Sequence, residues 1–403
     1  MKSAVIQRAR RTASASFPVR ASALALCVLA LAGCSTVKGW FDGKDDDQTE
    51  PAKLADITPS ITISELWSVD AGKGEGSLGA RQHPAVADGR VYAAAVEGGV
   101  HAFDLQTGSR VWSFESELSL SGGPGTGEGL VVVGSLDGAV IALDAASGAE
   151  KWRAEVGNEV IAAPAVGLGL VFVRSNDGRI TAFDAATGER RWFWNHEVPS
   201  LSVRGNDAPV LGPGYVFVGN DDGTVSALSA VDGRPLWEQA VGQQEGRTEL
   251  DRMADVDGTP VLDNTTLFAT SFKGRTMAID APTGQPMWVS DQGGPGQVAA
   301  APSVLVVTEP GGTVYGLEKR SGSALWSQPA LARRNVTAPA IHGGYAVVGD
   351  YDGYLHWLDL GTGEFAARER AGGDALRAPP IVADDILVVQ DVDGELSAFR
   401  IAH

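Results

Sequence analysis

The chain has 403 residues, 44% of them apolar, and a formal net charge of -18, so it can bury a sizeable core and general disorder is excluded. Its 51 glycines follow no three-residue period, which excludes collagen and favours a β structure rich in turns. So acidic a surface repels phosphate backbones, and nucleic acid is therefore not an expected partner.

The N-terminus has the pattern of an export signal. Five basic residues and no acidic residue precede Cys34. The apolar run from Ala21 to Ala32 is shorter than the roughly 20 residues of a membrane-spanning helix, so it predicts a secretory signal. The run leads into Leu31-Ala32-Gly33-Cys34, which is similar to a bacterial lipobox. We expect residues 1–33 to be removed and Cys34 to carry a lipid; an ordinary signal with a coincidental cysteine is the alternative.

The exported part carries all of the acidity. Removing five of the 32 basic residues leaves 27 Lys and Arg against 50 Asp and Glu, a net charge of -23. The chain has two cysteines, Cys27 within the signal and Cys34 after it, so the folded body has none for a disulfide. Ser35 after the lipid-bearing cysteine is similar to the pattern of lipoproteins sorted to the outer membrane. Residues 34–60 predict a solvated, flexible tether.

A single repeat fills the chain from residue 61 to residue 403. Each copy contains short apolar runs separated by Asp-Gly and Thr-Gly turns, and no amphipathic helical stretch intervenes, so each copy predicts four antiparallel strands. Eight prolines mark the copies: Pro84, Pro124, Pro164, Pro209, Pro260, Pro302, Pro339 and Pro379. Seven copies have a tryptophan in the same slot, at positions Trp67, Trp112, Trp152, Trp192, Trp237, Trp288 and Trp326, and the eighth slot holds Ala367.

The two ends of the chain are complementary. The strand around Trp67 precedes any complete copy, while the last copy stops at Arg400 before reaching its own tryptophan strand. We therefore predict an all-β fold, an eight-bladed β-propeller of four-stranded antiparallel blades, in which the N-terminal strand completes the last blade. The tryptophans are expected to pack between blades rather than to hold a cofactor. Ala367 predicts looser packing in its slot.

Two insertions interrupt the repeat in consecutive copies. The tryptophan-to-proline spacing is 12 after Trp112, but 17 after both Trp67 and Trp192 and 23 after Trp237, and the last two connections belong to consecutive copies. Equivalent connections lie on one face of a propeller, so we expect these two longer connections to be neighbours there. Leu201 and Val203, apolar residues in the first of them, predict an exposed partner site. The alternative is that both side chains fold back over the blade edge.

The sequence offers no catalytic or metal motif. The six histidines are scattered, so a zinc site is not expected. Two Asp-x-Asp-Gly runs, Asp255–Gly258 and Asp391–Gly394, lack the later glutamate of a calcium loop and are predicted to be turn aspartates bonded to their own backbone. A Gly-x-Ser-x-Gly elbow is absent as well. We predict that the protein is not an enzyme and has neither metal nor cofactor.

Three runs carry a resemblance to a known family. They are Pro199–Gly205, Thr248–Asp257 and Val348–Trp357, and the first two lie in the insertions. Together with the lipobox and the eight repeats, these runs resemble the BamB family of outer-membrane protein assembly factors. A generic propeller shares the repeat but not the runs.

The resemblance implies a scaffold lipoprotein of the outer membrane that faces the periplasm. Its implied partners are the POTRA domains of the barrel-inserting subunit BamA, the other barrel-assembly lipoproteins and, as an open question, unfolded outer-membrane proteins. The implied contact residues are Leu201, Val203, Arg204, Asp255 and Asp257; the family pattern has Leu where this chain has Val203, so that contact has a shorter reach.

Two other functions remain open at this stage. Quinone-dependent dehydrogenases have similar blades, but they typically hold the quinone under a pair of adjacent cysteines, and the body of this chain has no cysteine beyond the lipid site. A periplasmic quinoprotein is therefore the disfavoured alternative. The third function is binding of sugars or peptides in the central channel, for which the sequence gives no argument in either direction.

Overall fold

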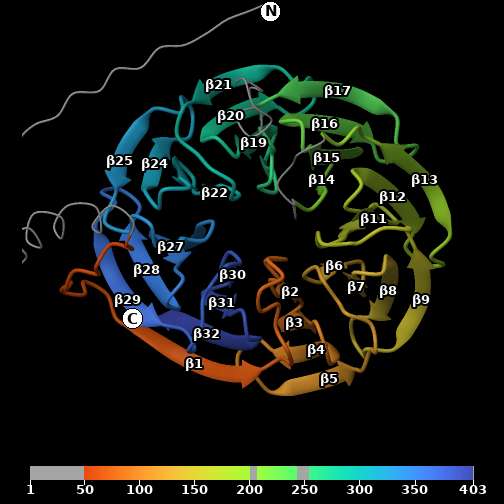
Figure 1. The fold of residues 1–403 in the computed structure, drawn as a ribbon, viewed down its shortest axis with the longest axis horizontal. Coiled ribbons are helices and arrows are strands. Elements are labelled where there is room, and N and C mark those ends of the chain that lie inside the picture. Colours follow the sequence, from red (N-terminus) through yellow and green to blue (C-terminus); the bar gives the residue numbers. More distant parts are fainter. Residues whose placement is uncertain (1–49, 200–206, 243–253, 403) are drawn as a thin grey trace, which may run out of the picture. The chain divides into compact units, whose positions relative to one another are not determined.

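Eight four-stranded antiparallel sheets are arranged around a central axis, each sheet forming one blade of a ring (Figure 1). We describe the protein from a computed structural model, which describes residues 50–199, 207–242 and 254–402. Residues 51–403 form one compact unit. All regular elements in the described residues are strands, so the predicted all-β propeller of eight blades is confirmed.

We number the blades from 1 to 8 in the order of their first strands. The strands of blades 1 to 4 are β2 (Ala85–Ala87), β3 (Arg90–Ala95), β4 (Gly99–Asp104), β5 (Arg110–Phe114), β6 (Gly125–Gly127), β7 (Leu130–Gly134), β8 (Ala139–Asp144), β9 (Glu150–Glu155), β10 (Ala165–Gly167), β11 (Leu170–Arg174), β12 (Arg179–Asp184), β13 (Arg190–Asn195), β14 (Val210–Gly212), β15 (Tyr215–Gly219), β16 (Thr224–Ser229) and β17 (Pro235–Ala240). The strands of blades 5 to 8 are β18 (Val261–Asp263), β19 (Thr266–Ser271), β20 (Arg275–Asp280), β21 (Pro286–Ser290), β22 (Ala299–Ala300), β23 (Val304–Thr308), β24 (Val314–Glu318), β25 (Ala324–Gln328), β26 (Ala340–His342), β27 (Tyr345–Gly349), β28 (Tyr354–Asp359), β29 (Phe365–Arg370), β30 (Ile381–Ala383), β31 (Ile386–Gln390), β32 (Glu395–Ile401) and β1 (Ile63–Asp70).

Both ends of the chain build blade 8. Its sheet has the order β1-β32-β31-β30, and β1 pairs with β32 from Ile63 opposite Ile401 to Asp70 opposite Glu395. Figure 1 shows the orange β1 along the outside of the blue β32. The predicted closure is therefore confirmed. Because closure supplies a partner for the edge of β32, this edge is not free to pair with another chain.

The burial pattern follows strand position within a blade. The second and third strands are buried over most of their length, and β7 over all of it, because neighbouring blades cover both of their faces. The fourth strands alternate instead, and in β9 only Trp152 is fully buried. Alternation with one inward-facing residue is what a strand with one solvated face requires.

The tryptophans of the fourth strands join each blade to the next. Each indole Nε1–H donates to a backbone carbonyl in the turn between the third and fourth strands of the following blade, at 2.8–3.1 Å. The seven pairs are Trp67–Leu105, Trp112–Ala145, Trp152–Ala185, Trp192–Ala230, Trp237–Ala281, Trp288–Lys319 and Trp326–Leu360. The predicted packing between blades is confirmed, and each indole also satisfies its polar group.

Blade 7 exchanges the two residues of this motif. In blade 2 the third strand carries Ala142 opposite Trp152, whereas in blade 7 it carries Trp357 opposite Ala367. Trp357 is fully buried and Ala367 is 1% exposed, so the expectation of looser packing is wrong. The reason lies in blade 8, whose third and fourth strands come from opposite chain ends. No turn joins them, and an indole at Ala367 would have no turn to receive it.

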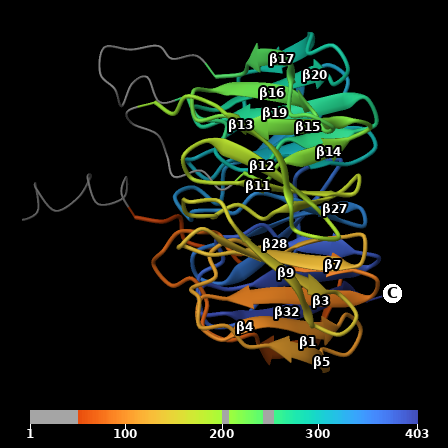
Figure 2. The same ribbon diagram turned by 90° about the vertical axis from the view of Figure 1, so that its right-hand side faces the viewer.

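Chain direction sorts the loops onto two faces. The connections between blades, and the turns between second and third strands, lie at one end of the strands; we call this the connection face. The turns between first and second strands, and between third and fourth strands, lie at the other end. Both insertions therefore start and end on the connection face. Figure 2 views the ring from the side, so that its two faces lie on opposite sides of the picture.

Candidate functional site

The two insertions meet at their described ends. The amide of Ala208 donates to Thr259 Oγ1 at 2.9 Å, linking the connection into blade 4 with the connection into blade 5. A Cβ on Gly219 would lie 2.7 Å from the carbonyl of Val256 and 2.9 Å from Asp207 Oδ2, so both connections also pack on β15. The sequence predicts that these two connections are neighbours, and their described ends are in contact. Leu201, Val203 and Arg204 lie outside the described residues, as does Cys34.

Ion pairs fix the end of the first insertion. Arg174, at the end of β11, pairs with Asp207 and places its other terminal nitrogen 2.7 Å from Asp221 Oδ1. All three side chains are nearly inaccessible to water. The sequence reasoning missed Arg174. The sequence feature that could have identified Arg174 is its charge at the end of a second strand. The corresponding residues of the other seven blades are uncharged: Ala95, Gly134, Gly219, Ser271, Thr308, Gly349 and Gln390.

Asp255 and Asp257 are buried in the connection into blade 5, at 0% and 3% exposure. Neither carboxylate oxygen of Asp257 has a hydrogen-bond partner within the described part of the chain. Burial, reinforced by the negative charge of Asp255, raises the pKa of Asp257 to about 7. Ionising such a group in a dry site costs free energy that an external donor or cation recovers on binding.

The two Asp-x-Asp-Gly runs therefore differ. Asp391 behaves as predicted, because its Oδ1 accepts hydrogen bonds from the amides of Asp393, Gly394 and Glu395. Asp257 is the third residue of its run rather than the first, and the prediction of a turn aspartate does not hold for it, because within the described part of the chain its carboxylate accepts no backbone amide. A turn aspartate stabilises its own loop, whereas Asp257 lies buried at the channel wall with both oxygens lacking a donor in the described residues.

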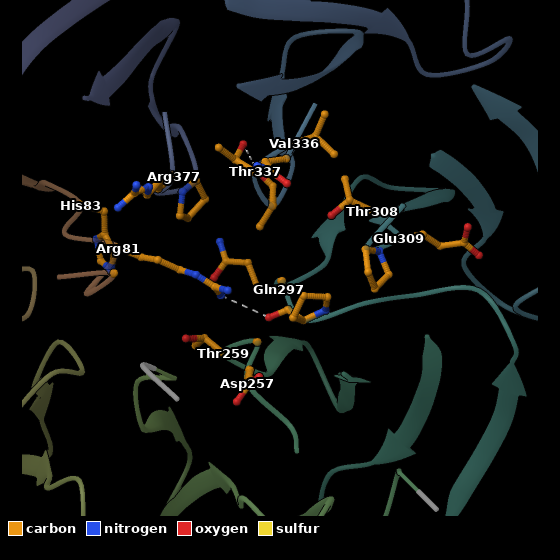
Figure 3. Close-up of a pocket in the computed structure, with 18 residues that line it drawn as sticks. Arg81, His83, Asp257, Thr259, Gln297, Thr308, Glu309, Val336, Thr337 and Arg377 are labelled. Carbon is orange, nitrogen blue, oxygen red and sulfur yellow. Dashed lines mark hydrogen bonds between the residues drawn. The ribbon is translucent and has the colours of Figure 1, made fainter. Parts of the chain in front are cut away.

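A cavity of about 440 Å³ lies in the central channel beside Asp257 (Figure 3). The loops that enter blades 1, 5, 6, 7 and 8 line it, and they contribute Arg81, Gln297 and Arg377. Figure 3 shows the Arg81 side chain reaching into the cavity, where it makes a long hydrogen bond of 3.5 Å to the carbonyl of Pro295. Its positive charge opposes the rise in the pKa of Asp257. Sequence reasoning missed both arginines, since they lie between repeat motifs.

The chemistry of this site suits recognition of polar groups. No tryptophan, tyrosine or phenylalanine lines the described wall of the cavity, whereas pockets for flat organic cofactors are predominantly apolar and aromatic. Among the described residues no group of three or more His, Cys, Asp or Glu is arranged to hold a metal ion. Charged and amide groups facing one cavity can orient a partner's polar side chains by charge-assisted hydrogen bonds.

Within residues 50–199, 207–242 and 254–402, no helix is long and apolar enough to cross a bilayer.

Eight closed blades, interblade indoles and a polar insertion face together define the class: a tryptophan-docked β-propeller that presents its distinctive residues on one face. Within that class, the chain belongs to the family of the outer membrane protein assembly factor BamB. The family model with that description matches residues 62–117, 96–328 and 310–403.

Curated relatives support this membership over nearly the whole chain. The outer membrane protein assembly factor BamB of Xanthomonas campestris is 61% identical over 397 residues, which cover 95% of this chain and 98% of the relative. The protein of the same name from Pseudomonas aeruginosa is 42% identical and covers 94% of this chain and 98% of its own length. The one from Escherichia coli is 34% identical, with 92% and 95% covered.

Solved structures give the same result for the fold. BamB from Moraxella catarrhalis is similar with a TM-score of 0.76 and 28% identity, covering 84% of this chain and 100% of that one. A quinohemoprotein alcohol dehydrogenase from Comamonas testosteroni has a TM-score of 0.67 at 17% identity, covering 84% of this chain and 76% of that one. At that identity the likeness shows the propeller fold alone, so the quinoprotein alternative is not favoured.

Proposed function

We propose that the chain is a non-catalytic scaffold of the machinery that assembles outer-membrane β-barrels, and that it binds the POTRA domains of BamA. Family membership supports the assembly role, because the relatives are named as outer membrane protein assembly factors. The observation that carries a binding role for this site is Asp257. A fold that buries a carboxylate with no donor in the described part of the chain forgoes stability, and a partner that supplies a donor recovers it.

The proposed contact surface combines the two insertions. Leu201 and Val203 supply apolar contacts, while Arg204, Asp255 and Asp257 orient the partner through charged hydrogen bonds. The lining of the channel is polar and carries both charges, which fits a protein partner better than a flat quinone.

The proposed location is the periplasmic side of the outer membrane. Residues 1–33 act as the signal, Cys34 carries the lipid, residues 34–60 connect it to the body, and residues 61–403 form the propeller. The other lipoproteins of the machinery join the same assembly. Unfolded outer-membrane proteins are the substrates on whose folding the assembly acts.

Affinity purification from detergent-solubilised envelopes tests this proposal. We expect BamA to co-purify with the wild-type chain, and Leu201→Ala, Arg204→Glu and Asp257→Asn each to reduce its recovery several-fold. Glu189→Lys is the matched control, because this exposed residue lies in the turn between β12 and β13 on the opposite face. Retention of BamA by all three folded variants contradicts the site, and absence of BamA from the wild type contradicts the function.

A further inference from the structure

The third run that resembles the family, Val348–Trp357, lies in blade 7, away from the two insertions. It spans the turn between β27 and β28, on the connection face. The proposed partner site makes no use of it.

Part of the segment that precedes β1 lies against blade 7 and the loop before it. The amide of Ala52 donates to the carbonyl of Ala332 at 2.9 Å, and the amide of Ser60 donates to that of Ala366 at 2.8 Å. Between them, Leu54 packs against the buried cluster that contains Trp326. The red start of this segment is visible at one side of the ring in Figure 2. Residues 52–60 are therefore docked along the blade, although the sequence assigns them to the tether.

Two arginines hold the backbone of the docked segment. Arg334 Nη1 donates to the carbonyl of Ala52 at 3.1 Å, and Arg368 Nη1 donates to the carbonyl of Ala55 at 2.9 Å. Hydrogen bonds to main-chain carbonyls hold the backbone of a segment and do not depend on the identity of its side chains. Arg334 is 3% exposed, so its charge needs partners within the protein.

The run around Asp350 supplies those partners. Arg334 Nε lies 2.7 Å from Asp350 Oδ2, and Arg334 Nη2 lies 2.7 Å from Asp352 Oδ2. The ring of Tyr351 stacks under the same guanidinium, with its centroid 4.9 Å from Cζ. The run thus fixes Arg334 in place through three consecutive residues.

His356 connects the second arginine to the same aspartate. Arg368 Nε donates to His356 Nδ1 at 3.1 Å, so His356 must donate through Nε2 to Asp350 Oδ2, which lies 2.9 Å away. His356 and Asp350 are both fully inaccessible. One buried carboxylate therefore orients both guanidinium groups.

Blade 8 shows that a blade needs none of this network. Asp391 occupies the turn position of Asp350 and binds the turn amides with one oxygen. At the register where blade 7 pairs His356 with Arg368, blade 8 pairs Ser397 with Ser68. The histidine and the two arginines are therefore not required by the repeat. Within the described residues, the hydrogen bonds of the two arginines outside blade 7 and its entry loop go to Ala52 and Ala55.

We propose that Arg334, Arg368 and the run Asp350–His356 form a docking site for the chain's own tether, here called the clasp. The clasp makes the N-terminal segment leave the propeller at blade 7 on the connection face, the same face as the loops that carry the proposed partner site. This inference rests on the proposed function only for the lipid at Cys34. With the clasp closed, residues 35–51 can span at most about 60 Å, whereas residues 35–62 could span about 100 Å.

Limited trypsin digestion of the full-length protein in detergent tests the clasp, because Lys53 lies within the docked segment. We expect cleavage after Lys53 to be slow in the wild type and about tenfold faster in Leu54→Ala, since that change removes most of the apolar contact, alters no propeller residue and adds no charge next to the cleaved bond. Cleavage after Lys44 provides the internal reference. Thr58→Ala also truncates a side chain, at an exposed position of the same segment, and should leave the rate unchanged.

Hydrogen exchange of the Ala52 and Ser60 amides gives the second readout. Both should be protected in the wild type and in Thr58→Ala, and both should exchange faster in Leu54→Ala and in Arg368→Gln. Equal rates of cleavage and exchange in the wild type and Leu54→Ala overturn the clasp. Neither readout depends on BamA, so loss of BamA from the envelope purification with normal protection contradicts the proposed function and leaves the clasp standing.

Discussion

Asp257 combines burial, a position on the channel wall and a carboxylate that has no hydrogen-bond donor among the described residues. Its folded-state pKa of about 7 lies above the unfolded value near 4, so the folded state binds the extra proton between these pH values. Stability contributed by the protonated form is complete below about pH 4 and is lost as the pH rises through 7. At neutral pH the residue therefore destabilises the fold, as a residue kept for binding can do.

Asp257→Asn should reverse this loss. Because the variant cannot ionise, we expect its free energy of unfolding at pH 8 to exceed that of the wild type by up to about 4 kcal/mol, with little difference at pH 4. Urea unfolding at both pH values measures the change. Asp291→Asn is the control, since that side chain is 88% exposed and should show no such pH-dependent gain. An equal effect of Asp257→Asn at both pH values contradicts the assigned burial cost.

At the scale of elements, the seams between blades are built from one indole and one glycine turn. Gly148 has φ +74°, and a Cβ there would lie 2.6 Å from Trp112 Cε3. Gly129 has nearly the same backbone, φ +75°, but nothing lies within 4 Å of its Cβ position. The first glycine is required by both conformation and contact, the second by conformation alone.

This pair gives a direct measure of the seam. Gly129→Ala should cost about 1 kcal/mol of stability from backbone strain, whereas Gly148→Ala should cost about 1–3 kcal/mol more because the methyl group displaces the indole. Chemical denaturation measures both, and the near-ultraviolet circular dichroism of tryptophan should change for Gly148→Ala alone. Equal costs for the two variants would show that the indole contact does not limit the seam.

At the scale of the whole molecule, the ring depends on the pairing of its two chain ends. Loss of β1 removes the partner of β32 and also removes the Trp67 indole, which donates to the carbonyl of Leu105 in blade 1. Both the exposed strand edge and the open seam then favour association between chains.

Two truncations test ring closure. A chain that begins at Ala71 should aggregate or fail to fold, whereas one that begins at Pro51 keeps β1 and should remain folded and monodisperse. Far-ultraviolet circular dichroism and analytical ultracentrifugation distinguish the two states. A stable, monomeric chain from Ala71 onward would show that blade 8 does not need its fourth strand.

The repeat could be counted in the sequence because each blade uses the same local chemistry. Turn glycines, strand-length apolar runs and, in seven of the eight copies, a tryptophan recur at similar offsets, so blade number and ring closure followed from counting. The exchange of Trp357 and Ala367 could not be read this way. It depends on which residue faces a neighbour across the strands, and on the absence of a turn where the ring closes.

The candidate site likewise has features that the sequence indicated and features that only the tertiary structure shows. Insertion lengths alone indicated the face and the neighbouring connections, because equivalent connections of a propeller share a face. The donor-free burial of Asp257, the arginines in the channel and the clasp that joins Asp350 to residues 52–55 required the tertiary structure. Sequence determines local periodicity, whereas burial and charge pairing arise between segments far apart in the chain, and only the folded ring brings those segments into contact.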